Sequence, residues 1–260
     1  MSEAAASKGL EWKWIILGTI VGSIFSVALY LIMSATFVTG TVPTFMSLLG
    51  FIVMGIIIGY KSHGYTIKEP AIGGVLTAII TAVVLMKVSE RFTPSTTEWV
   101  GAPIIGFLFG LLGGWVGEQI QVTPEEAKKE LEDQAKGKLQ WGWIFAGTIV
   151  AFILNAFFVF GLFVVLKFDV GGILFALGAS FILAGLITGY FSPGITIREA
   201  AAAGAFSMIL NFLLIYFGFE HTILPIDYLL GTLVGGFVLS LLGGWLGEKL
   251  QSFMEDRIED

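Results

Sequence analysis

The sequence predicts an all-α integral membrane protein of eight transmembrane helices, built as two tandem parallel four-helix repeats. Three observations support this fold class. The 260 residues are 56% hydrophobic and 13% charged, whereas a soluble domain carries about 25% charged residues. Eight apolar runs approach the roughly 20 residues that a helix needs to cross the hydrocarbon core. The second half of the chain also repeats the pattern of the first.

The eight predicted spans follow one another with mostly short connections. They cover residues 14–38, 44–60, 67–88, 99–118, 141–166, 170–190, 197–218 and 225–247. Backbone groups in lipid must find hydrogen-bond partners within the protein, so each run is expected to be a helix. A β-barrel would alternate apolar and polar residues in short segments. The first run is too long for a signal-peptide core, and we expect it to remain as an uncleaved span.

Five pairs of matching segments define the internal repeat. The pairs are 10–14 with 139–143, 18–20 with 147–149, 59–60 with 189–190, 64–69 with 194–199, and 111–118 with 241–248. The offset is 129 residues in the first two pairs and 130 in the others. Each copy holds four spans, and an even number returns the chain to the side where it started. We therefore predict parallel rather than inverted repeats, over residues 1–121 and 139–251.

Lysine and arginine residues predict the orientation, because cytoplasmic connections carry an excess of both. The side of the two termini is expected to hold Lys8, Lys13, Lys61, Lys68, Lys128, Lys129, Lys136, Lys138, Arg198, Lys249 and Arg257. The opposite side holds Lys87, Arg91 and Lys167. We therefore expect both termini in the cytoplasm, in a prokaryotic cytoplasmic (inner) membrane. The seven tryptophans all stand near span ends, where indole rings prefer the headgroup region.

A charged linker over residues 122–138 joins the two repeats. Thr123 suits a helix N-cap, Pro124 the first helical position and Glu126 the third, so a helix is expected to start here. We expect this helix on the cytoplasmic surface, either as a solvated linker or as a docking surface for a soluble partner. Residues 252–260 form the equivalent segment after the second repeat, predicted as an acidic cytoplasmic tail.

A turn that recurs in both copies carries a predicted set of helix caps. Its members are Gly64, Thr66 and Glu69 in the first copy and Gly194, Thr196 and Glu199 in the second. Threonine followed three residues later by glutamate has the spacing of a capping box, and glycine suits a turn that needs positive φ. We interpret these residues as structural; the alternative is a ligand loop built from both copies.

The repeated Gly-Gly-Trp-x-Gly-Glu motif predicts close helix packing. The residues concerned are Gly110, Gly114, Gly117 and Glu118, and Gly243, Gly244, Gly247 and Glu248. Small residues at this spacing allow helix backbones to approach closely in lipid. A carboxylate at a helix C-terminus opposes the helix dipole. Each glutamate is therefore either solvated or offset by a cation, with Lys68 and Arg198 as the candidates.

An uncharged polar stripe recurs inside the predicted spans. It comprises Thr19, Ser26, Thr77, Thr81, Thr148, Asn155, Ser207 and Asn211, with Ser23 on the same face as Thr19 and Ser26. Such residues commonly hydrogen-bond between helices, at about 0.6 kcal/mol each. The alternative is that they line a path for water or a small solute between the repeats. The two asparagines are the most costly to leave unpaired, and they are the strongest candidates for either role.

Several function classes are disfavoured by what the sequence lacks. Charged residues are missing at mid-membrane depth, which argues against an ion-coupled pump, and no basic stripe suits nucleic acid. The chain has no cysteine and two histidines. Glu220, His221 and Asp227 could form an outer metal site, but a short solvated loop is the preferred interpretation. No nucleophile with a nearby base is visible, so we expect no enzyme activity, no cofactor and no metal.

Two functions remain open from the sequence. The favoured one is a non-catalytic scaffold or subunit of a membrane assembly, suggested by the glycine-rich packing faces and the charged linker. Its partners would be the lipid bilayer, other membrane subunits or a soluble protein on residues 122–138, and oligomers are compatible with it. The alternative is a passive channel or uncoupled transporter for a small solute through the polar stripe.

Overall fold

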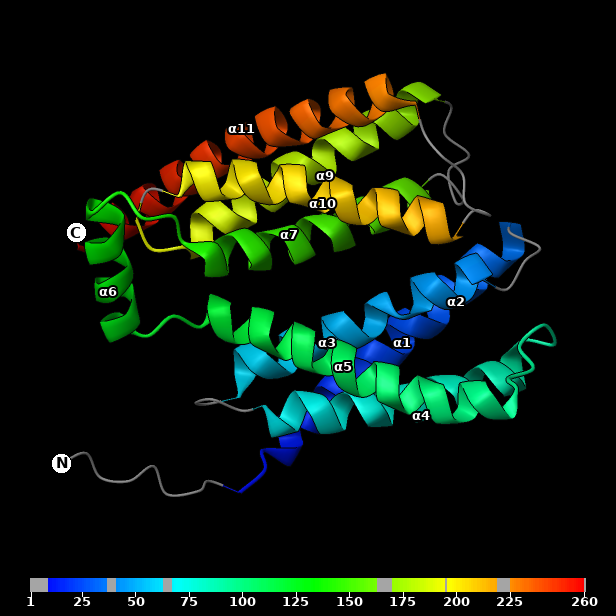
Figure 1. Ribbon diagram of the computed structural model, residues 1–260. Helices are drawn as coiled ribbons and strands as arrows, with labels where there is room; N and C mark the ends of the chain where they lie inside the picture. Colours follow the sequence, from blue (N-terminus) through cyan, green and yellow to red (C-terminus); the bar gives the residue numbers. More distant parts are fainter. Residues whose placement is uncertain are drawn as a thin grey trace. The chain divides into compact units, whose positions relative to one another are not determined.

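A computed structural model describes residues 9–36, 41–62, 67–162, 170–194, 196–218 and 225–259. The regular elements of these residues are all helical. They are α1 (Trp12–Thr36), α2 (Thr41–Ser47), α3 (Leu49–Lys61), α4 (Lys68–Val88), α5 (Thr96–Ile120), α6 (Pro124–Ala135), α7 (Trp141–Ala156), the π-helix η1 (Phe157–Leu162), α9 (Val170–Phe191), α10 (Ile197–Gly218) and α11 (Ile226–Glu259), shown in Figure 1.

Eight stretches of the described residues are long and apolar enough to cross a membrane. They cover residues 12–35, 42–61, 68–88, 96–120, 141–159, 174–191, 197–216 and 226–254. Each overlaps one predicted span, so the predicted all-α class and the eight spans are confirmed. The chain is a multi-pass membrane protein by this criterion, and its spans imply contact with the lipid bilayer.

Three details differ from the predicted spans. The second span is broken at Leu48, which separates α2 from α3. The fifth changes from α-helix to π-helix at Phe157. The helix of the eighth span, α11, runs for 34 residues from Ile226 to Glu259 and so extends past residue 247 into the predicted acidic tail. The tail is rich in residues that tolerate a helix, such as Met254 and Glu255, so the helix need not end where its apolar part does.

The chain divides into two compact units. One comprises residues 1–31 and 46–118, and the other residues 32–45 and 119–260. The charged helix α6 therefore belongs to the second unit. It starts as the sequence predicts: Thr123 and Glu126 form a reciprocal capping box, with Pro124 at the start of the helix. Its connection to α7 turns at Gly137, where φ is +76°.

In the first unit, α5 packs against α3 and α4 through glycines. A Cβ atom added to Gly59 would meet the backbone of Gly114, and one added to Gly74 would meet the backbone of Gly106. Gly110 faces the carbonyl oxygen of Pro70 in the first turn of α4. Proline is tolerated there because the first N–H groups of a helix have no acceptor within it. These contacts leave no room for side chains.

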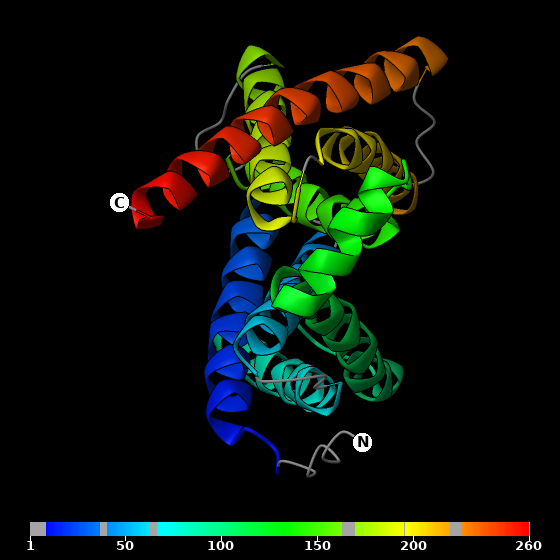
Figure 2. The same ribbon diagram turned by 90° about the vertical axis from the view of Figure 1, so that its left-hand side faces the viewer.

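In the second unit, α11 crosses α9 and α10 in the same manner, as Figure 2 shows for the red and orange helix. Gly189 faces the backbone of Gly244, and Gly204 faces the backbone of Gly236. The pairs Gly59–Gly114 and Gly74–Gly106 of the first unit become these pairs when 130 is added to each number. Two further contacts follow the same rule: Gly113 with Ile52 and Gly117 with Ile56 correspond to Gly243 with Ile182 and Gly247 with Leu186.

Apolar side chains that face away from their own unit complete the arrangement. On α11, Leu230, Val234 and Phe237 are exposed, and on α5 the same is true of Val100 and Leu108. Rows of exposed apolar side chains on helices long enough to cross a membrane suit contact with lipid rather than with water. Gly231 and Gly235 lie on the exposed part of α11, and a Cβ atom on either would meet nothing.

Candidate functional site

Three helices of the second unit meet at a buried polar cluster. Asn155 on α7 is 1% exposed, and Ser180 on α9 and Ser207 on α10 are fully buried. The Asn155 amide Nδ2 donates to Ser207 Oγ at 3.4 Å, and Ser180 Oγ donates to Asn155 Oδ1. One amide therefore connects three spans. In lipid such bonds hold helices together, because no water competes for the donors and acceptors.

Other predicted polar residues of this unit bond to the backbone. Thr148 Oγ1 donates to the Ile144 carbonyl oxygen at 2.7 Å, and Asn211 Nδ2 donates to the Ser207 carbonyl oxygen at 2.9 Å. Ser207 Oγ can itself donate to the Gly204 carbonyl oxygen at 2.8 Å. Each of the four predicted residues of this half therefore makes at least one side-chain hydrogen bond within the protein.

The corresponding hydroxyls of the first unit have no such partners. The five hydroxyls of Thr19, Ser23, Ser26, Thr77 and Thr81 are buried and make no hydrogen bond. Their residues are between 0% and 6% exposed. Leaving a buried hydroxyl unpaired costs about 1–3 kcal/mol. The two halves of the predicted stripe thus differ in their hydrogen bonding. The polar side chains of the second unit are hydrogen-bonded, whereas the buried hydroxyls of the first unit are not.

Ser180 is a member of the cluster that sequence reasoning missed. Its counterpart 130 residues earlier is Gly50, so the position is not polar in both copies. In the first unit the Ser26 hydroxyl lies where a Cβ atom of Gly50 would stand. Ser180 is the one serine of the apolar run 170–190, and this could have marked it as a polar residue inside the membrane. It was missed because only positions that are polar in both copies were considered.

The turn before α10 and the first turn of that helix contain the three predicted caps of the second copy, Gly194, Thr196 and Glu199. Gly194 has φ +79°, the left-handed conformation predicted for it. Thr196 lies next to Ser192 through their hydroxyls, and its N–H donates to Glu248 Oε1 at 2.5 Å. Glu199, which is 3% exposed, accepts from the N–H of Gln140 at 3.2 Å. The Thr196 hydroxyl thus pairs with Ser192 of the same turn, and the Glu199 carboxylate accepts from Gln140, in place of the predicted capping box.

In the first copy, the predicted caps Gly64 and Thr66 lie outside the described residues. Glu69 is in the first turn of α4 and is 5% exposed.

Glu248, which the sequence left open as either solvated or paired with a cation, bonds to the backbone at the start of α10. Its carboxylate accepts from the backbone N–H at the start of α10, while Arg198 is exposed. Gly244 and Gly247 let α11 approach closely enough for this contact. The carboxylate thus lies at the positive end of the α10 dipole, which offsets the unfavourable dipole of its own helix. Glu118 is half-buried at the equivalent end of α5.

Helix α6 is fixed to its own unit through Glu130. The indole Nε1 of Trp143 donates to Glu130 Oε2 at 3.0 Å, and Gln119 Nε2 to Oε1 at 3.5 Å. The side-chain amide of Gln140 donates to the Glu130 carbonyl oxygen at 3.2 Å. Burial raises the pKa of Glu130; the bonds from Trp143 and Gln119 oppose this, and the charge of Glu126 adds to it.

The raised pKa of Glu130 predicts a pH-dependent attachment of α6. Because the folded state binds the proton more tightly than the unfolded chain, the stabilisation is complete below pH 4.5 and is lost as pH rises through the raised pKa. Glu130→Gln keeps an acceptor for Trp143 and removes the charge. We expect slower amide hydrogen exchange in α6 of this variant at neutral pH than in the wild type. Equal exchange in both proteins would contradict the assignment, and Glu132→Gln, at an exposed position, is the control.

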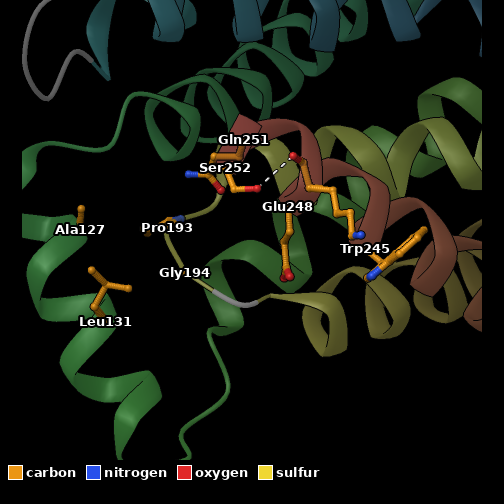
Figure 3. A pocket seen from close by; sticks show the side chains of 9 residues that line it. Ala127, Leu131, Pro193, Gly194, Trp245, Glu248, Gln251 and Ser252 are labelled. Carbon is orange, nitrogen blue, oxygen red and sulfur yellow. Dashed lines mark hydrogen bonds between the residues drawn. The ribbon is translucent and has the colours of Figure 1, made fainter. Parts of the chain in front are cut away.

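An open groove of about 700 Å³ lies beside the attached helix. It is bordered by α6, by the turn before α10 and by the end of α11, as seen in Figure 3. The lining residues are Ala127, Leu131, Pro193, Gly194, Trp245, Glu248, Lys249, Gln251 and Ser252. Leu131 and Gln134 also enclose Gly194, where a Cβ atom would meet both side chains.

Searches for similar proteins find no matching family model, no matching curated protein and no matching solved structure. Among the described residues, no three histidine, aspartate or glutamate side chains gather as metal ligands. Glu220 and His221, which the sequence analysis considered as metal ligands and interpreted as part of a solvated loop, lie outside these residues. Function must therefore be argued from the geometry of this chain alone.

Proposed function

We propose that this protein is a non-catalytic scaffold or subunit of a membrane assembly. The observation that carries the proposal is the hydrogen-bonded attachment of a charged helix to a unit that contains membrane-spanning helices. Glu130 anchors the inner side of α6 to Trp143 and Gln119. The outer side of the helix presents exposed charged residues: Glu125, Lys128, Lys129, Glu132 and Lys136. A fixed helix with both signs of charge suits recognition of a soluble partner.

The proposal includes the finer architecture. We infer two tandem parallel four-helix repeats with both termini in the cytoplasm, which would place α6 on the cytoplasmic side. The glycine contacts that recur at an offset of 130 support the duplication. The excess of lysine and arginine on one side supports the orientation. The chain has no cysteine, so a single cysteine at position 128 can be labelled in intact cells to test the side directly.

Cross-linking in native membranes tests the scaffold. A lysine-reactive cross-linker should join Lys128, Lys129 or Lys136 to a second protein, identified by mass spectrometry after mild solubilisation. Reversing two charges with Lys128→Glu and Lys129→Glu should remove that protein. Reversing Lys87, on the opposite predicted side, is the control. A monodisperse monomer with cross-links only within the chain would contradict the proposal.

A second candidate is a passive channel or uncoupled transporter for a small neutral solute. The five unpaired buried hydroxyls of the first unit favour it, because groups that water or a solute could satisfy would otherwise remain unbonded. Purified protein in liposomes should then raise the permeability to water or to small polyols above that of empty liposomes. Permeability equal to that of empty liposomes for all of these solutes would exclude this function.

A further inference from the structure

The groove beside α6 has opposite charges at neighbouring positions of α11. Glu248 and Lys249 both line it, and consecutive helix positions point about 100° apart. Glu199, which does not itself line the groove, lies close enough to Glu248 to act on it electrostatically, so a second carboxyl group stands behind this side of the groove. Lys249 is exposed, with Nζ 4.8 Å from the ring centre of Trp245. The groove therefore presents a dipole rather than a single sign of charge.

The rest of the lining is mostly apolar, apart from Gln251 and Ser252, and exposed apolar side chains of α11 lie next to it. Ala127 and Leu131 stand across the groove from Glu248 and Ser252, with Pro193 and Gly194 between them (Figure 3). Trp245 is 45% exposed at the border. Leu246, Leu250 and Phe253 are exposed on the same stretch of α11, within the apolar span 226–254. A molecule in the groove can thus place a polar group inside and an apolar tail along α11.

We propose that this groove binds a phospholipid with a zwitterionic, primary-amine headgroup of the ethanolamine type. The headgroup ammonium would lie at Glu248 and the phosphate at Lys249, with the acyl chains along Leu250 and Phe253. An ionised carboxylate can accept about four hydrogen bonds, so Glu248 retains capacity beyond its bond to Thr196. The volume of about 700 Å³ is within the usual range for small-molecule sites.

The charge pattern distinguishes this headgroup from the other common ones. An anionic headgroup without an amine would meet Glu248 and Glu199 with like charge. A choline headgroup carries no N–H donor for the carboxylate. The first unit does not repeat the site: the position equivalent to Lys249 is Gln119, and the position equivalent to Ser252 is Val122. The pairing of Glu248 with a neighbouring cation on the helix is thus not repeated in the first copy.

Native mass spectrometry of the purified full chain can test the site. Detergent-solubilised protein is titrated with phosphatidylethanolamine, phosphatidylcholine and phosphatidylglycerol. We expect the first lipid to bind several-fold more tightly than the other two. Lys249→Gln, which copies the first unit, should weaken its binding about fivefold, the upper end for one exposed ion pair. Lys136→Gln, outside the groove, should leave binding unchanged.

Glu248→Gln provides the second arm, because it keeps an acceptor for the Thr196 N–H while it removes the charge. It should bring the affinities for the ethanolamine and choline lipids together. Soluble phosphoethanolamine should compete only weakly, since it lacks the acyl chains. Equal binding of the three lipids by the wild type, or unchanged binding in Lys249→Gln, would overturn the proposal. The experiment uses only the purified chain and lipid, so its outcome does not depend on the proposed protein partner.

Discussion

Replacing Gly189 by alanine is expected to destabilise the second unit by about 1–3 kcal/mol, the usual cost of forcing extra atoms into a packed core. The new Cβ atom would meet the carbonyl oxygen, carbonyl carbon and Cα atom of Gly244. Since all three are backbone atoms, no rotamer change relieves the clash, and α9 must move away from α11. Thermal unfolding in detergent, followed by intrinsic tryptophan fluorescence, measures the loss.

Gly235→Ala is the matched control for this substitution. Gly235 lies on α11, four residues after Gly231, and a Cβ atom at either position would meet nothing within the chain. Alanine favours a helix over glycine by about 1 kcal/mol. We therefore expect the control to be neutral or slightly stabilising. If both variants unfold at the same temperature, the close approach of α9 and α11 at Gly189 is wrong.

Gly59→Ala extends the test to the first unit. Its Cβ atom would meet the backbone of Gly114, as that of Gly189 would meet Gly244. A similar loss in both variants is expected if the two units are copies of one packing design. A loss in only one of them would contradict the inferred duplication.

The membrane spans were predictable because each depends on local composition alone. A run of about 20 apolar residues must be helical in lipid whatever its neighbours are. The start of α6 was predictable for the same reason. Its capping signals are local, because they all lie within one turn: Thr123, Pro124 and Glu126. The break at Leu48 was not, because neither proline nor glycine stands at that position.

The partners of polar residues could not be derived from the sequence. Glu248 has its bond because the end of α11 reaches the start of α10, and only the packing of the helices brings them together. The same holds for Glu130, which α6 presents to Trp143 of the following helix. Sequence reasoning found Asn155 and Ser207 by their recurrence, and it missed Ser180 because Gly50 occupies the matching position.

Asn155→Ala is expected to have the second large effect. It removes the amide that joins α7 to α9 and α10, and it deprives Ser180 and Ser207 of a partner each. Interhelical bonds in membranes contribute about 0.6 kcal/mol on average and up to about 1.7. The loss of two of them, with the vacated volume, should lower the stability by about 2–4 kcal/mol. Unfolding in detergent measures this loss. A loss below about 0.5 kcal/mol would show that the cluster does not stabilise the packing of α7 against α9 and α10.

Ser26→Ala is the counterpart in the first unit, and it separates the two proposed functions. The Ser26 hydroxyl is fully buried and has no hydrogen-bond partner. If it stands in a dry interface, its removal relieves an unpaired polar group, and the variant should be more stable by about 1 kcal/mol. If water or a solute bonds to it, removal deletes that bond, and both stability and liposome permeability should fall. The scaffold proposal predicts the first result, because a closed helix bundle holds no water or solute that could bond to the hydroxyl.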